Sequence, residues 1–215
     1  MADKLSSLFK KDRNAFKEKW NDIKVVIEYG MLSEDKFFDK AENFALFPTT
    51  KGEYFTFEEL KEALKDTQTD KDDKLILLYA SDAEAQHSYI EQAKNKGYKV
   101  LLLDSPIISH LIQKLEGSKE NISFARVDGD TIENLIKKEE ASVSKLTDDE
   151  KETLKPIIEE VVKEGGYTVQ LEPLDSSSLP FVLTQPEFMR RMKEMQQTGG
   201  GGMMGAMPDM YNLVV

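Results

Sequence analysis

Two aspartates stand where a small parallel sheet could offer ligands to a metal ion. Asp82 follows the apolar run KLILLY (74–79) closely, and Asp104 comes directly after YKVLLL (98–103). Ligands of such folds bind at the carboxyl ends of the strands. The pair therefore predicts one candidate function, a small α/β enzyme that uses Mg²⁺ and a phosphorylated substrate. The competing interpretation is that Asp82 and Asp104 only stabilise the first turns of the helices after them.

The sequence lacks other enzyme signatures. It contains no GxGxxG or GxxxxGK[ST] loop, and it has no cysteine for thiolate catalysis or a Cys-rich zinc site. His87 and His110 each have a serine neighbour, Ser88 and Ser109, but adjacent residues of a helix do not face each other. A Ser–His nucleophile pair is not expected, and we assign no catalytic, cofactor-binding or metal-binding residue.

Methionine is concentrated near the end of the chain, where seven of the nine occur. Phe188, Met192 and Met195 share one face of an expected helix, Met189 lies beside them, and more methionines follow in a Gly-rich stretch. Flexible thioethers adapt to irregular apolar partners, so an exposed surface of this kind suits binding to many proteins. The alternative is that the stripe packs inward as core. The candidate contact residues here are Phe188, Met189, Met192, Met195, Met203 and Met204.

The pattern over residues 74–127 predicts a β-α-β-α-β unit, with strands at 74–79, 98–103 and 122–127. Capping residues predict where the intervening helices begin: Ser81 with Glu84, then Ser105 with Pro106. This order predicts a small parallel sheet with helices on its faces.

Helices are expected ahead of this unit, within residues 4–65. An apolar stripe predicts one helix over 4–29 that ends at Gly30, and Ser33 is expected to open a second. A capping box of Thr56 and Glu59 predicts a third.

The region after residue 146 is predicted to be α+β. Thr147 and Glu150 open a helix that Pro156 should kink or split, and Thr184 with Glu187 caps a shorter one. Strands are expected at 167–171, at 179–183 and at the chain end. The residues expected to be buried by the first helix are Leu154, Ile157, Ile158, Val161 and Val162. We divide the chain into a domain at 1–137, a linker at 138–146 and a second domain at 147–215.

Composition excludes several partners. The 215 residues carry 29 Lys and Arg against 40 Asp and Glu, a net charge of −11, which argues against nucleic acid and anionic membranes. The first twenty residues have no long apolar core and no small-residue cleavage site, so we expect no signal peptide there, and no apolar run approaches the ~20 residues that span a bilayer. A cytoplasmic protein is expected.

Five segments, in this order, resemble the 90-kDa heat-shock chaperone family, particularly its bacterial form. They are FKEKWNDIKVVIEYGMLSED, KLILLYASD, GYKVLLLDSPIISHLIQKLEG, LTDDEKETLKPIIEEVV and YTVQLEPLDSSSLPFVLT. The resemblance implies that 1–137 is the later part of a middle domain and that 147–215 begins a C-terminal domain. The ATP-binding domain and the dimerisation helices would then lie outside this chain, which we expect to be a segment of a larger protein.

The resemblance also implies a function. It implies a chaperone that binds unfolded client proteins, uses ATP and Mg²⁺, and forms a homodimer when full-length; this segment would have no ATPase and no cofactor of its own. The family's client-binding helix corresponds to Phe188, Met189, Met192 and Met195, and its middle-domain contacts correspond to His110 and Leu111. A third interpretation is a spacer without client contact.

Overall fold

Helices dominate the first third of the chain, and small sheets follow. The structure is a computed structural model that describes every residue except 139–143, 145, 175–178 and 199–208. The elements are α1 (Ala2–Lys11), α2 (Arg13–Glu18), α3 (Trp20–Ser33), α4 (Asp35–Ala41), β1 (Phe47–Pro48), β2 (Tyr54–Phe55), α5 (Phe57–Gln68), β3 (Leu75–Ala80), α6 (His87–Asn95), β4 (Leu101–Leu102), α7 (Ile108–Ser118), β5 (Ile122–Arg126), α8 (Ile132–Leu135), α9 (Asp148–Val162), η1 (Lys163–Gly165), β6 (Thr168–Gln170), β7 (Val182–Thr184), α10 (Glu187–Thr198) and β8 (Asn212–Val214).

The expected single helix over residues 4–29 is wrong, because three helices occupy the N-terminal region. The first break is at Asp12, whose backbone is extended and whose side chain accepts the N–H of Ala15. The second break is at Lys19. Phe16 and Trp20 flank this break, and both are buried with ring centroids 6.2 Å apart. The breaks therefore direct aromatic side chains from successive helices into one core.

Gly30 does not end α3, which continues to Ser33. A Cβ at Gly30 would lie 2.8 Å from the ring of Phe37, so the glycine allows α4 to pack closely against α3. The next helix is preceded by Glu34 rather than opened by Ser33.

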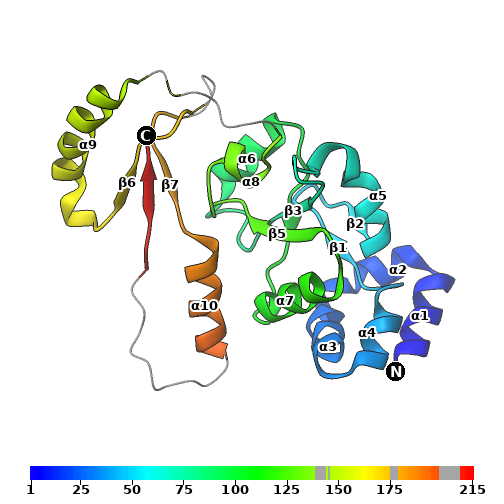
Figure 1. Ribbon diagram of the computed structural model, residues 1–215. Helices are drawn as coiled ribbons and strands as arrows, with labels where there is room; N and C mark the ends of the chain where they lie inside the picture. The colour runs from blue at the N-terminus through cyan, green and yellow to red at the C-terminus, as the bar shows by residue number, and fades with distance from the viewer. Residues whose placement is uncertain (139–143, 145, 175–178, 199–208) are drawn as a thin grey trace.

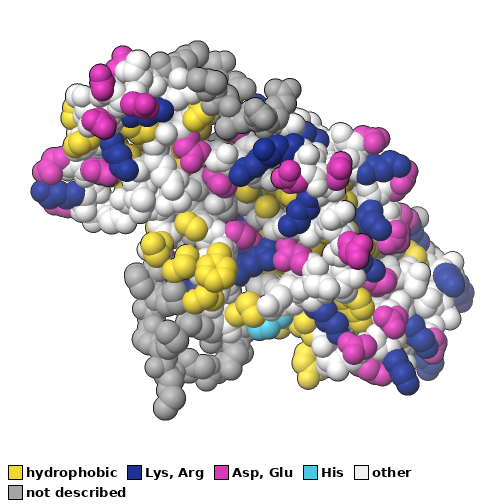
Figure 2. Space-filling view, in the orientation of Figure 1, with side chains coloured by type: hydrophobic (Ala, Val, Ile, Leu, Met, Phe, Trp, Pro, Cys, Tyr) yellow, Lys and Arg dark blue, Asp and Glu magenta, His cyan; other side chains and the backbone are white. Residues whose placement is uncertain are grey.

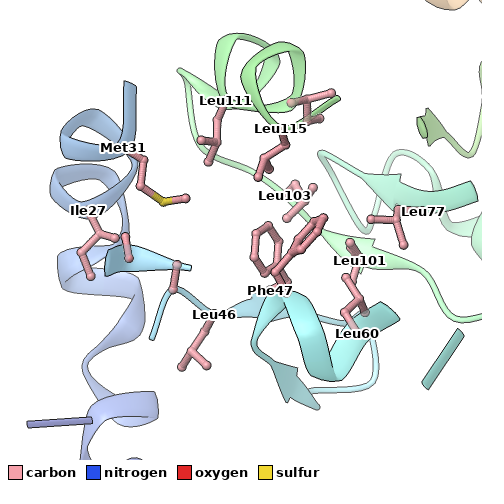
Figure 3. Packing of buried hydrophobic residues seen from close by; sticks show 14 of the residues in the cluster. Ile27, Met31, Leu46, Phe47, Leu60, Leu77, Leu101, Leu103, Leu111 and Leu115 are labelled. Carbon is pink, nitrogen blue, oxygen red and sulfur yellow. The ribbon is translucent and has the colours of Figure 1, made fainter. Parts of the chain in front are cut away.

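The β-α-β-α-β prediction is confirmed. The parallel sheet has the order β4-β3-β5, with β3 in the centre (Figure 1). Alternate residues of β3 enter two apolar clusters. Leu77 and Tyr79 pack toward α3, α5 and α7, while Ile76 and Leu78 pack toward α6 and α8. Figure 3 shows the first cluster closed by α3 and α7.

Local details of this unit differ from the prediction. The side chain of Gln86 accepts the N–H groups of Ser81 and Asp82, and α6 begins only at His87, so the capping box at Ser81 is wrong. Ser105 accepts the N–H of Ile107, and α7 begins after Pro106. By contrast, the capping boxes at Thr56 and Thr147 are present as predicted.

The C-terminal elements form a sheet of order β6-β8-β7, with α9 against β6. The expected burial of the apolar face of α9 is wrong: Ile157 is 59% and Val161 is 80% exposed, and no residue of α9 is buried. The helix also runs unsplit through Pro156. An amphipathic pattern marks a face but not its partner, and the described part of the chain leaves a wholly apolar groove between α9 and Phe181.

Candidate functional site

We call the parallel sheet β4-β3-β5 and the helices on its two faces the αβα unit. Helix α10 turns its charged side toward this unit, beside α7. Glu187, Arg190, Arg191 and Glu194 are spaced three or four residues apart, so their side chains share one helical face. Every one of them bonds to a residue of the αβα unit. This inward face is therefore polar.

Arg190 lies at the centre of the contact. Its side chain is only 4% exposed, and its guanidinium donates to the hydroxyl of Tyr79 at 2.5 Å. It also donates to Glu187 Oε1 at 2.6 Å and to Glu194 Oε1 at 2.5 Å. The Tyr79 hydroxyl in turn donates to Glu187 Oε1 at 3.1 Å. One residue of the central strand thus holds two residues of α10.

Arg191 and Glu194 extend the contact along α7 and β5. Arg191 donates to Glu116 Oε2 at 2.7 Å and to the carbonyl of Phe124 at 2.6 Å. Ser109 donates its hydroxyl proton to Glu194 Oε2 at 2.5 Å. These bonds fix α10 along its length as well as at one point.

The strand before α10 is attached in the same polar manner. Tyr89 donates to the carbonyl of Leu183 at 2.5 Å. The N–H of Gln185 donates to the carbonyl of Asp128 at 2.8 Å. The orientation of β7 is thus set before the helix begins.

Burial and charge act against each other in this contact. Burial disfavours the charge on Arg190, but Glu187, Tyr79 and Glu194 more than offset it, and the pKa of Arg190 is raised. Burial also disfavours ionised Glu194, yet the Ser109 hydroxyl and Arg190 lower its pKa overall. Burial, followed by the charge of Glu187, raises the pKa of Tyr79, which keeps its hydroxyl protonated. The contact therefore favours charged Arg190 and charged Glu194 beside a protonated Tyr79 hydroxyl.

The opposite face of α10 is apolar and points away from the unit. Phe188 is 73% exposed, and the methionines at 189, 192 and 195 are half-buried. Figure 2 shows hydrophobic side chains gathered over this helix. We name this surface the α10 contact face: Phe188, Met189, Met192 and Met195. Met203 and Met204 lie outside the described residues.

His110 and Leu111, the two candidate contact residues on α7, differ in their accessibility. His110 is half-buried and lines a pocket of about 300 Å³ between α7 and α10, together with Pro106, Arg190 and Glu194. Leu111 is 2% exposed and points into the core beside Met31, so its assignment as a contact residue is wrong (Figure 3). Adjacent residues of a helix point in different directions, and only one of these two faces outward.

The enzyme candidates have structural partners instead. Asp82 accepts the N–H groups of Glu84 and Ala85, and Asp104 pairs with Lys24 at 2.5 Å. Ser109 donates to Glu194 rather than to His110. Within the described residues, no three His, Asp or Glu side chains are grouped to hold a metal ion. No helix of the described part is long and apolar enough to cross a membrane.

Sequence reasoning missed the inward face of α10. Its signal was present, because the charged residues repeat with the same helical period as the apolar ones. Tyr79 gave no signal, since it ends an uninterrupted apolar run and resembles any core residue there.

The whole chain aligns with bacterial chaperones. It is 45% identical over 219 residues to "Chaperone protein htpG" of Bacteroides fragilis (strain YCH46). It is 44% identical to the protein of that name in Bacteroides thetaiotaomicron and 42% identical to the one in Porphyromonas gingivalis. Each alignment covers all of this chain and 32% of the relative, so the chain spans about a third of the length of the curated relatives it matches.

Two further comparisons add little. The middle domain of a Plasmodium falciparum heat shock protein is 14% identical and covers 58% of this chain and 52% of its own, with a TM-score of 0.45, too low to decide the fold. No protein-family model matches. Because the bacterial relatives match it over all of its length at 42–45% identity, the chain belongs to the HtpG family of 90-kDa heat-shock chaperones.

Proposed function

We propose that this chain contributes client binding to an HtpG chaperone through the α10 contact face. The observation that carries the proposal is the orientation of α10. Its charged side forms hydrogen bonds to the αβα unit, and its apolar side, with Phe188 73% exposed, faces outward. A helix that served only as core would be oriented the other way.

Such a face gains free energy when an unfolded protein covers it. Burying one large apolar side chain stabilises a complex by about 1.5–3 kcal/mol. Methionine side chains change rotamer readily, so the same face would accept clients of different shape. The net charge of −11 keeps a protein with exposed apolar surface soluble.

The other assignments stand as proposals around this surface. His110, at the rim of the α7–α10 pocket, would extend the contact, and Met203 and Met204 would add adaptable apolar groups. We propose the domain division 1–137, 138–146 and 147–215. ATP and Mg²⁺ binding, ATP hydrolysis and homodimerisation are proposed for the full-length protein outside this segment, in the cytoplasm.

The test is suppression of aggregation of a heat-denatured model client, without ATP. The variant Phe188→Asp/Met192→Asp puts two charges on the face, and an acid in the first turn of α10 suits the helix dipole. Val26→Asp, at a 55% exposed apolar residue of α3, is the matched control.

We expect the parent and the Val26→Asp control to suppress aggregation equally. The double variant should need at least ~tenfold more protein for the same effect, because two apolar contacts are lost. Equal suppression by all three, with unchanged circular dichroism, would reject the α10 contact face as the binding site.

A further inference from the structure

Tyr79 is held rigidly in the middle of the parallel sheet. It pairs with Leu101 on one side and Arg126 on the other, and the whole residue is 1% exposed. Its ring belongs to the larger apolar cluster, but its hydroxyl emerges where α10 docks. The central strand of the sheet thus places a polar atom at the contact with α10.

Two charged residues of α10 bond to that hydroxyl, one as a donor and one as an acceptor. Arg190 donates to it at 2.5 Å, and Glu187 accepts from it at 3.1 Å. Glu187 and Arg190 also bond to each other at 2.6 Å, so three groups close a ring of hydrogen bonds. All three hydrogen bonds can form together at only one rotational orientation of α10 about its helix axis.

The contact of Tyr79 with Glu187 and Arg190 contributes little net free energy to the docking of α10. Arg190 Nε and Glu187 Oε2 are buried without a hydrogen-bond partner in the described structure. Each such atom costs desolvation free energy that nothing returns. Replacing a buried ion pair by well-packed apolar residues is often neutral or stabilising, and in some proteins buried polar groups act instead by selecting one geometry.

From these contacts we infer that Tyr79 and Arg190 are positioning residues that keep the apolar side of α10 outward. Without them, the hydrophobic effect would favour turning Phe188 and the methionines against the unit, as in an ordinary amphipathic helix. The importance of this role rests on the proposed function, but the orientation itself is measurable without any client.

The chain has no cysteine, so two introduced cysteines label it cleanly. We place spin labels at Phe188→Cys on α10 and His87→Cys on α6, because both positions are well exposed. Rotation of α10 about its axis moves the first label and leaves the second in place. The distance distribution between the labels is measured by pulsed electron paramagnetic resonance.

The test variants are Tyr79→Phe and Arg190→Gln. Tyr98→Phe is the control, because Tyr98 lies against the other apolar cluster, away from α10. We expect one narrow distance in the labelled parent and in Tyr98→Phe. Tyr79→Phe and Arg190→Gln should each show a broadened distribution or a second distance, and amide exchange in α10 should rise about tenfold, the size expected for a lost hydrogen bond to a charged group.

Two results would overturn the inference. One is an unchanged narrow distance in both variants. The other is a lowered melting temperature with the parent distance, which would mean that the two residues support stability only. Arg190→Gln leaves the β3 core intact, so it remains informative if Tyr79→Phe loses structure. Because no client is present, a failed aggregation assay and a failed orientation test are distinguishable.

Discussion

The guanidinium of Arg190 lies 2.5 Å from the hydroxyl of Tyr79, although 111 residues separate the two in the chain. Arg190 belongs to a short helix of the C-terminal region, and Tyr79 to the central strand of the parallel sheet. Their contact explains how an amphipathic helix comes to face outward with its apolar side.

Gly30→Ala should destabilise the protein, because its Cβ would lie 2.8 Å from the ring of Phe37. We expect a loss of about 1–3 kcal/mol, as for other overpacked sites. Gly117→Ala in α7 is the control, since its Cβ meets nothing within 4 Å. There alanine should stabilise the helix by about 0.5–1 kcal/mol. Urea unfolding measures both, and the same sign in both would contradict the packing described.

Removal of the Thr56 cap should lower stability by about 1 kcal/mol. The capping box holds the start of α5, which buries Phe57, Leu60 and Leu64 in the main core. Thr147→Ala removes the same motif from α9, which buries no residue. Its effect on global unfolding should be smaller, with fraying confined to α9 in amide exchange. Equal effects on global unfolding would show that α9 is as strongly coupled to the core as α5.

Truncation of two isoleucines should change stability by very different amounts. Ile112→Ala, at a fully buried site of α7, should cost about 2–5 kcal/mol. Ile157→Ala, at a 59% exposed site of α9, should change stability by less than about 0.5 kcal/mol. Chemical denaturation checks both values. A large loss at Ile157 would restore the buried α9 that the sequence pattern suggests.

Acid should weaken the contact between α2 and α5. Arg13, and then the backbone N–H of Thr56, lower the pKa of Glu59 from 4.5 to about 2. The unfolded chain therefore takes up this proton at higher pH than the folded chain. The stabilisation is complete above pH 4.5 and is lost as the pH falls toward 2. Both side chains are more than a third exposed, so solvent screening limits it to about 1 kcal/mol.

Glu59→Gln should remove that part of the pH dependence. Glu58→Gln, on the same turn but paired with Lys61, controls for the change of net charge. Stability curves between pH 5 and 2 that stay parallel for the parent and Glu59→Gln would contradict the assignment.

The sequence allowed the parallel sheet and the capped helices to be predicted for physical reasons that are local. Buried parallel strands are continuous apolar runs, as in β3, and a capping box such as Thr56–Glu59 bonds within four residues. The break at Lys19 could not be predicted, because the apolar stripe continues across it while tertiary packing of Phe16 and Trp20 decides the geometry.

The sequence predicts less well which helix faces are buried in the C-terminal region. The apolar stripes of α9 and α10 look alike in sequence, and neither is fully buried: Ile157, Val161 and Phe188 are exposed, and the remaining apolar residues are half-buried. For α10, Tyr79 provides the cause, from a strand distant in sequence. Leu111 shows the reverse error, since a position matched to a family contact lies in the core.

Methionine oxidation tests the central claim most directly. Dilute peroxide oxidises exposed thioethers, and mass spectrometry follows each site separately. Met189 and Met192 lie on the proposed face, while Met31, 1% exposed, is the buried reference. We predict that a heat-denatured client slows oxidation of Met189 and Met192 severalfold, that the same client in its native state does not, and that Met31 stays slow throughout. Unchanged rates at Met189 and Met192 with a saturating unfolded client would contradict the account.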